Sequence, residues 1–296
     1  MNRALPLSAS PAGRQHLVGI ALLLGACSCL ACLDASAKWL SRTADPLQTA
    51  SVRYVGSSLL VAAFLNPRTR PGILRTRSLR LQVARSFCLV FSTVCVFSAL
   101  RYLPLAEVTA ITFSAPLIIA LIAAPMLGER IDARRIAAAL AGFAGVLVGT
   151  RPWGGAHPAA FLAALAACGN ALYSVATRLL AARDSPETTL FYTGLVGAAL
   201  LLPVAPLVWV PPATPTAWLV MAATGGFGAL GHWLLILAYR RAPASTLAPF
   251  LYAQLLCATA LGLVVFGEVP DRWTLVGAAI LIASGLYLLG HERRRA

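Results

Sequence analysis

The second half of the chain repeats the first. Residues 99–129 return as residues 238–268 at an offset of 139 positions, so Glu129 corresponds to Glu268. Each unit is therefore about half of the 296 residues, far longer than a solenoid or propeller repeat. The duplication predicts two homologous half-domains that face each other, with the functional site between them.

Composition places both units in lipid. Aliphatic, aromatic and Cys residues make up 59% of the chain, charged residues only 11%, and the mean hydropathy is +0.78. Runs of about 17 to 25 apolar residues are long enough to cross the hydrocarbon. Ten such runs are expected, near 17–36, 47–65, 83–100, 105–127, 133–150, 158–180, 188–209, 216–239, 243–266 and 273–290.

Five spans per unit fix the relation between the halves. An odd number of spans makes the second unit enter the membrane in the opposite orientation. The predicted fold is therefore an all-α membrane protein of ten transmembrane helices in two inverted five-helix repeats. Residues 1–150 form the first repeat and residues 151–296 the second.

Basic residues predict the orientation. Most of the 24 Lys and Arg residues fall on one face when both termini are placed in the cytoplasm, which agrees with the positive-inside rule. We expect a multi-pass protein of the bacterial inner membrane. The net charge of +14 is spread over short loops without interleaved aromatic residues, so a lipid bilayer and not a nucleic acid is the expected partner.

The N-terminal segment resembles a secretory signal, because Arg3 and Arg14 precede an apolar run and Ala35-Ser36-Ala37 imitates a cleavage site. Span 1 has a counterpart in span 6, so cleavage would remove one helix from one repeat only. We therefore expect span 1 to be retained.

The seven cysteines all lie in apolar runs. They are interpreted as small packing residues, because cysteines two positions apart on a helix do not share a face for metal binding. No metal and no cofactor is expected.

Spans 5 and 10 differ from the other spans. Gly142, Gly145 and Gly149 in span 5, and Gly277 and Gly285 in span 10, lie among apolar residues. Small residues let helices approach closely in lipid. Packing within one chain is favoured over a homodimer contact, and both a monomer and a homodimer stay open.

The repeated motif resembles a known superfamily. Residues 99–106, ALRYLPLA, lead to residues 125–130, PMLGER, and the second copy runs from 238 to 268. This pattern is similar to the drug/metabolite transporter superfamily, and within it to ten-helix bacterial exporters of aromatic amino acids and other metabolites. The resemblance implies that spans 1, 3, 4, 6, 8 and 9 surround a central cavity, with spans 5 and 10 aside.

The same superfamily contains a small four-helix multidrug branch that relies on a buried Glu in its first helix. Span 1 of this chain carries Asp34 instead. Proton coupling by an equivalent residue therefore does not follow from the resemblance.

Ionisable side chains in hydrocarbon cost about 2.5 to 3.5 kcal/mol, so each is a functional candidate. Asp34 and Lys38 are four residues apart in span 1 and share a helix face, so they are expected to neutralise one another. As a substrate site, Lys38 would hold a carboxylate and Asp34 an amino group. A structural ion pair near the outer interface is the alternative.

His232 and Trp233 follow a run of glycines in span 8. The glycines thin the helix, either for a ligand or for a neighbouring helix. His232 is a candidate for substrate contact and, less so, for proton coupling.

Other spans carry polar residues that lipid would not tolerate on its own side. Asn170 and Tyr173 begin a polar stripe in span 6 that continues to Thr177, and Tyr252 and Gln254 lie in span 9. We expect these residues to face protein or a cavity, and we include Asn170, Tyr173, Tyr252 and Gln254 among the substrate-binding candidates.

Two further pairings are expected. Arg53 in span 2 and Glu107 at the start of span 4 both lie toward the outer side and are expected to pair, either structurally or as part of a gate. Glu129 and Glu268 are interpreted as helix-end positions, with Glu268 near Arg272.

These features favour a membrane transporter, not an enzyme, that exports small amphipathic metabolites by alternating access. Aromatic or large neutral amino acids are the leading substrates, and sugar derivatives, nucleosides and lipophilic cations stay open. A membrane-embedded transferase would need clustered acids, bases or metal ligands, which the sequence does not show. A channel or scaffold is the third alternative.

Overall fold

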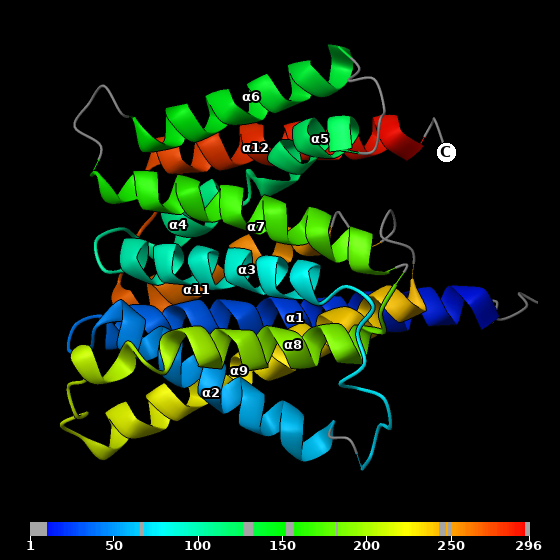
Figure 1. Ribbon diagram of the computed structural model, residues 1–296. Helices are drawn as coiled ribbons and strands as arrows, with labels where there is room; N and C mark the ends of the chain where they lie inside the picture. The colour runs from blue at the N-terminus through cyan, green and yellow to red at the C-terminus, as the bar shows by residue number, and fades with distance from the viewer. Residues whose placement is uncertain are drawn as a thin grey trace, which may run out of the picture.

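The chain folds as a bundle of helices that run side by side (Figure 1). The computed structural model describes residues 11–65, 68–126, 133–151, 157–181, 183–242, 247 and 250–293. Within these ranges every regular element is a helix, as the sequence predicts.

The first half supplies the following helices: α1 (Pro11–Leu40), α2 (Pro46–Phe64), α3 (Leu79–Leu100), α4 (Leu105–Thr112), α5 (Ala115–Met126) and α6 (Ala133–Thr150). The second half supplies α7 (Ala159–Ala181), α8 (Pro186–Leu201), the 3₁₀ turn η2 (Ala205–Leu207), α9 (Pro215–Arg241), α11 (Ala253–Phe266) and α12 (Arg272–Arg293).

Four helices of the described ranges are long and apolar enough to cross a membrane, judged by length and hydropathy alone. They are Gln15–Leu40, Leu79–Leu100, Ala159–Leu180 and Pro215–Arg241. Shorter apolar helices at Leu105–Ile119, Ile136–Thr150, Ala253–Phe266 and Arg272–Tyr287 accompany them.

Three helices begin in the same way. Asp45, Ser185 and Thr214 are N-caps, and each is followed directly by a proline at the first helical position. Each side chain accepts a hydrogen bond from a backbone N–H of the first turn. The proline needs no donor there, so these dipeptides fix the starts of α2, α8 and α9.

The predicted fourth span, residues 105–127, consists of two helices. α4 ends at Thr112 and α5 begins at Ala115, so the chain turns at Phe113 and Ser114. Pro116 lacks the N–H that would continue the helix through this turn. The Ser114 hydroxyl donates to the carbonyl of Ile111 at 2.7 Å, which satisfies part of the freed backbone.

Glycines let α2 and α9 cross in contact. A Cβ at Gly225 would lie 2.9 Å from the Cα of Gly56, so neither position has room for a side chain. The hydroxyl of Ser57 donates to the carbonyl of Gly225 at 2.9 Å across the same crossing. The glycine run in α9 therefore serves helix packing, one of the two roles that the sequence left open.

The glycines of spans 5 and 10 also serve contact within the chain. A Cβ at Gly145 in α6 would lie 2.9 Å from the carbonyl oxygen of Gly277 in α12. Figure 1 shows α6 and α12 together at one edge of the bundle. This peripheral place is the one that the superfamily resemblance implies for spans 5 and 10.

Asp184, between α7 and α8, binds the connection that leads into α3. Its carboxylate accepts from the Thr76 hydroxyl, from the Arg77 backbone N–H at 3.0 Å and from the Gln82 amide at 2.9 Å. Partial burial alone would raise the pKa of Asp184, but these hydrogen bonds outweigh it and hold the pKa below its usual value. The two halves of the chain are thereby joined at this end of the bundle.

The α2–α9 crossing predicts a difference between neighbouring glycines. Gly225→Ala should lower the thermal unfolding midpoint in detergent, because its Cβ meets backbone atoms of α2. Gly226→Ala is the matched control, since a Cβ there meets nothing within 4 Å. Equal midpoints for the two variants would contradict the proposed crossing.

The Asp184 contacts predict a pH dependence. Asp184→Ala should destabilise the protein by about 1 kcal/mol at pH 7. A carboxyl with a depressed folded-state pKa contributes stability above its unfolded pKa of about 3.9, and that stability is lost as the pH falls further. The gap in unfolding midpoint between the native chain and the variant should therefore narrow below about pH 4. A gap that stays constant down to pH 3 would show that the charge contributes nothing.

Candidate functional site

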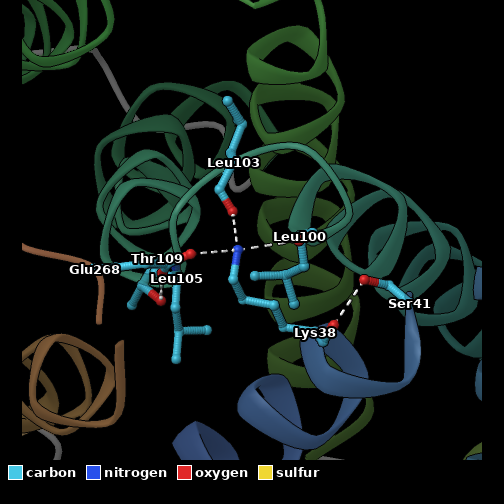
Figure 2. Close-up of polar contacts among 7 residues, drawn as sticks. All are labelled: Lys38, Ser41, Leu100, Leu103, Leu105, Thr109 and Glu268. Atoms are coloured by element: carbon cyan, nitrogen blue, oxygen red, sulfur yellow. Dashed lines mark hydrogen bonds and ion pairs between the residues drawn. The ribbon is translucent and has the colours of Figure 1, made fainter. Parts of the chain in front are cut away.

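Lys38 does not pair with Asp34, so that prediction is wrong. The Lys38 Nζ lies 2.8 Å from the Glu268 Oε1 and donates to the carbonyl of Leu103 at 2.5 Å and of Leu100 at 3.3 Å (Figure 2). α3 ends at Leu100, and helix-end carbonyls carry partial negative charge that attracts a cation. The long Lys38 side chain therefore reaches this helix end instead of the acid one turn away.

Glu268 is a helix-end residue, as predicted, but with different partners. Gly267, in the left-handed conformation, ends α11 and places Glu268 directly beyond it. The Glu268 Oε2 accepts from the backbone N–H of Leu105 at 2.9 Å and so caps α4 (Figure 2). Lys38, and not Arg272, is its cationic partner. Glu129, its counterpart in the repeat, lies outside the described residues.

Arg53 points into the bundle and not toward Glu107, which corrects the predicted pairing. It is 6% exposed, and it donates to the Thr93 hydroxyl at 2.5 Å. A Cβ at Gly228 would lie 3.3 Å from the Arg53 Nε, so the glycine leaves room for the guanidinium beside α9. The close α2–α9 crossing thus determines where Arg53 points.

His232 faces the interior of the bundle. The Arg53 guanidinium lies 3.4 Å from the His232 Nε2. A guanidinium only donates hydrogen bonds, so the Nε2 accepts and carries no proton in this arrangement. Thr93 lies on α3 and His232 on α9, so Arg53 bridges the two halves of the chain.

Arg85 is a site residue that the sequence analysis missed, because its place near the start of span 3 is also consistent with one of the basic residues on the cytoplasmic face. It is 4% exposed and lies inside α3. It donates to the hydroxyls of Thr177 at 2.6 Å, Thr193 at 2.7 Å and Tyr173 at 2.8 Å. The polar stripe of span 6 therefore faces protein, as predicted. The place of Arg85 within the apolar run 83–100 was the signal that could have revealed it as a buried residue.

Asp34 is the acid near these arginines. The positive charge of Arg53 and the side chain of Gln254 both lie close enough to stabilise its carboxylate. The positive charges of Arg53 and Arg85 both interact electrostatically with His232. One contiguous set, the central polar group, therefore joins α1, α2, α3, α7, α9 and α11: Asp34, Arg53, Arg85, Thr93, Tyr173, His232 and Gln254.

Three predicted residues lie apart from this group's contacts. Tyr252 packs against Phe113, with ring centroids 5.5 Å apart, and its hydroxyl lies against Gly285 of α12. Asn170 and Trp233 are half-buried on α7 and α9, and among the described residues neither side chain makes a polar contact with the group.

The central polar group carries an excess of positive charge. Within the described ranges it contains two guanidinium groups and one carboxylate, and every acceptor bonded to Arg85 is neutral. A buried cation without a charged partner is costly, and planar guanidinium groups match carboxylates. The group is therefore suited to receive an anionic group beside a cationic one.

A cavity of about 400 Å³ lies elsewhere, at the end of the bundle where Lys38 meets Glu268. Its charged lining residues include Glu107, Arg151, Glu268 and Asp271. Arg151 pairs with Asp271, and the Thr274 N–H donates to Asp271 at 2.7 Å and lowers the pKa of that carboxyl. We call this space the outer cavity, after the side of the membrane on which the sequence analysis expects it; its lining does not include the central polar group.

Comparison with known proteins decides the family. The EamA-like transporter family matches the chain twice, over residues 17–150 and 157–290. The chain belongs to the EamA-like transporter family. It is thus a multi-pass membrane protein of the drug/metabolite transporter superfamily with two EamA repeats. The superfamily that the repeated motif predicts is confirmed.

Relatives of this family match most of the chain. An S-adenosylmethionine uptake transporter of Rickettsia felis is 26% identical over 282 residues, covering 95% of each chain. A riboflavin transporter of Vibrio cholerae is 29% identical over 83% of this chain and 84% of its own. A pseudopaline exporter of Pseudomonas aeruginosa is 28% identical over 66% of this chain and 69% of its own.

A solved structure shares the fold. It aligns with a TM-score of 0.64 at 24% identity and covers 97% of this chain and 99% of its own.

The charge excess at Arg85 predicts an unusual stability result. Arg85→Met should unfold at a temperature no lower than the native chain, because an apolar side chain removes a buried, uncompensated charge. The hydroxyls of Thr177 and Thr193 keep bonds to carbonyls of their own helices. Arg80→Met, at the exposed start of α3, is the matched control. A loss of about 3 kcal/mol or more would show that Arg85 is structural.

Proposed function

We propose that this transporter carries zwitterionic metabolites of the amino-acid type that bear a large apolar or aromatic ring. The observation that carries the proposal is the pair of buried guanidinium groups with a single carboxylate in the central polar group. Arg53 and Arg85 would receive the substrate carboxylate, and Asp34 its ammonium group. This assignment gives the arginines the role that the sequence analysis gave to Lys38.

The relatives' substrates are compatible with this class in part. S-adenosylmethionine, named for the Rickettsia relative, carries an amino-acid group and an aromatic base. Riboflavin, named for the Vibrio relative, carries a ring system without a carboxylate. The central polar group favours the first kind of substrate, because its carboxylate can bond to Arg85, whose acceptors within the described chain are all neutral, and riboflavin offers no carboxylate.

We infer an alternating-access mechanism in which two inverted repeats rock about the central polar group. The two EamA matches support a duplicated architecture. The repeat boundary at 150/151, the inner-membrane location, the cytoplasmic termini and export as the direction of transport follow from the sequence predictions.

Counterflow in liposomes tests the substrate class. Purified protein should give saturable, trans-stimulated flux of tryptophan, phenylalanine or S-adenosylmethionine, and little flux of riboflavin. Arg85→Gln should reduce the flux more than about tenfold, because a hydrogen bond to a charged group contributes about 1.5 to 3 kcal/mol. Arg80→Gln is the control on the same helix and should transport normally.

Riboflavin flux without amino-acid flux would overturn the proposed class. Normal transport by Arg85→Gln would show that Arg85 does not bind the substrate. Substrate flux measured in the same liposomes with and without an imposed proton gradient shows whether transport is coupled to protons.

A further inference from the structure

The Lys38–Glu268 pair lies between the central polar group and the outer cavity. Asp34 and Lys38 are one turn apart on the same face of α1, and Asp34 belongs to the central polar group. On the other side, Glu268 lines the outer cavity. A solute that moves between the cavity and the central polar group along α1 must therefore pass this pair.

The pair also joins the two halves of the chain. Lys38 belongs to α1 of the first half, and Glu268 follows α11 of the second half. Their side chains are 12% and 24% exposed, so the pair is largely shielded but in reach of water. If the halves separate at this end, the ion pair must break.

Lys38 can exchange its carboxylate partner while its hydrogen bonds to backbone carbonyls remain. Its Nζ donates to the carbonyls of Leu100 and Leu103, which stay with the first half (Figure 2). Glu268 is the one charged partner of Lys38 among the described residues. A substrate carboxylate has the same charge and shape as the Glu268 carboxylate, so it can replace it at Lys38.

We propose that Lys38 and Glu268 form the outer gate of the transport path, and that Glu268 occupies the place at Lys38 that a substrate carboxylate takes during passage. The proposal rests on the transport function proposed above. It gives Lys38 a role in passage and leaves the binding role to the central polar group.

Distance measurement by electron paramagnetic resonance tests the gate without a substrate. Spin labels at Thr43→Cys and Val269→Cys flank the pair, and both positions are exposed. The labels are placed in a background without the seven native cysteines, after its folding has been verified.

Two substitutions remove the charge pair in different ways. Glu268→Gln keeps an oxygen that accepts from the Leu105 N–H, so the α4 cap remains while the charge is lost. Lys38→Met removes the cation and keeps a long apolar stem. Arg151→Gln, which breaks the exposed Arg151–Asp271 pair at the same end, is the matched control.

Both gate variants should gain a second, longer distance between the labels, and Arg151→Gln should not. When the labelled protein keeps Lys38 and Glu268, added tryptophan should increase the population of this longer distance. Unchanged distances in Glu268→Gln and Lys38→Met would overturn the gate.

Longer distances in the variants, without an effect of tryptophan and without tryptophan flux in liposomes, would support the gate and reject the substrate class instead. Tryptophan flux with unchanged variant distances would reject the gate and keep the proposed function.

Discussion

Two guanidinium groups buried inside a lipid-embedded bundle constrain the rest of this structure. Arg53 and Arg85 are both less than a tenth exposed, and neither can give up its proton. Each must therefore find acceptors from other helices. Arg53 finds them on α3 and α9, and Arg85 finds them on α7 and α8, so the contacts of the two arginines involve five helices around one centre.

The backbone is shaped to allow this arrangement. Gly56 and Gly225 bring α2 and α9 into contact, and Gly228 leaves space for the Arg53 side chain. At the end of the bundle that holds the outer cavity, the break between α3 and α4 exposes backbone groups that bind Lys38 and Glu268. At this end, charged side chains thus meet where the regular helix is interrupted, as expected when unpaired backbone groups must be satisfied in lipid.

Much of the fold was predictable because it follows from local or periodic signals. The apolar runs predicted the spans, and the repeated motif indicated the superfamily. The prolines after Asp45, Ser185 and Thr214 are further local signals of helix starts, although no prediction was drawn from them. The break at Phe113 was less visible, since an apolar run continues through it.

The site was predictable only in part. The sequence placed Asp34 and His232 in the interior, but spacing along α1 suggested the wrong partner for Lys38, whose true partners lie on other helices. Arg85 was not predicted as a site residue, because a basic residue near the end of a span is equally consistent with a position at the interface and with a buried position. The geometry of the helix crossings, and not the periodicity of the sequence, determines the partners and the burial of these residues.

The central claim is that the excess positive charge of the central polar group receives a carboxylate. Calorimetric titration of the purified protein with tryptophan and with tryptophanamide tests it most directly, because the amide keeps the ring and the ammonium group but lacks the carboxylate. We expect tryptophan to bind more than about tenfold more tightly, a difference of about 1.4 kcal/mol or more. Equal binding, or tighter binding of the amide, would contradict the claim.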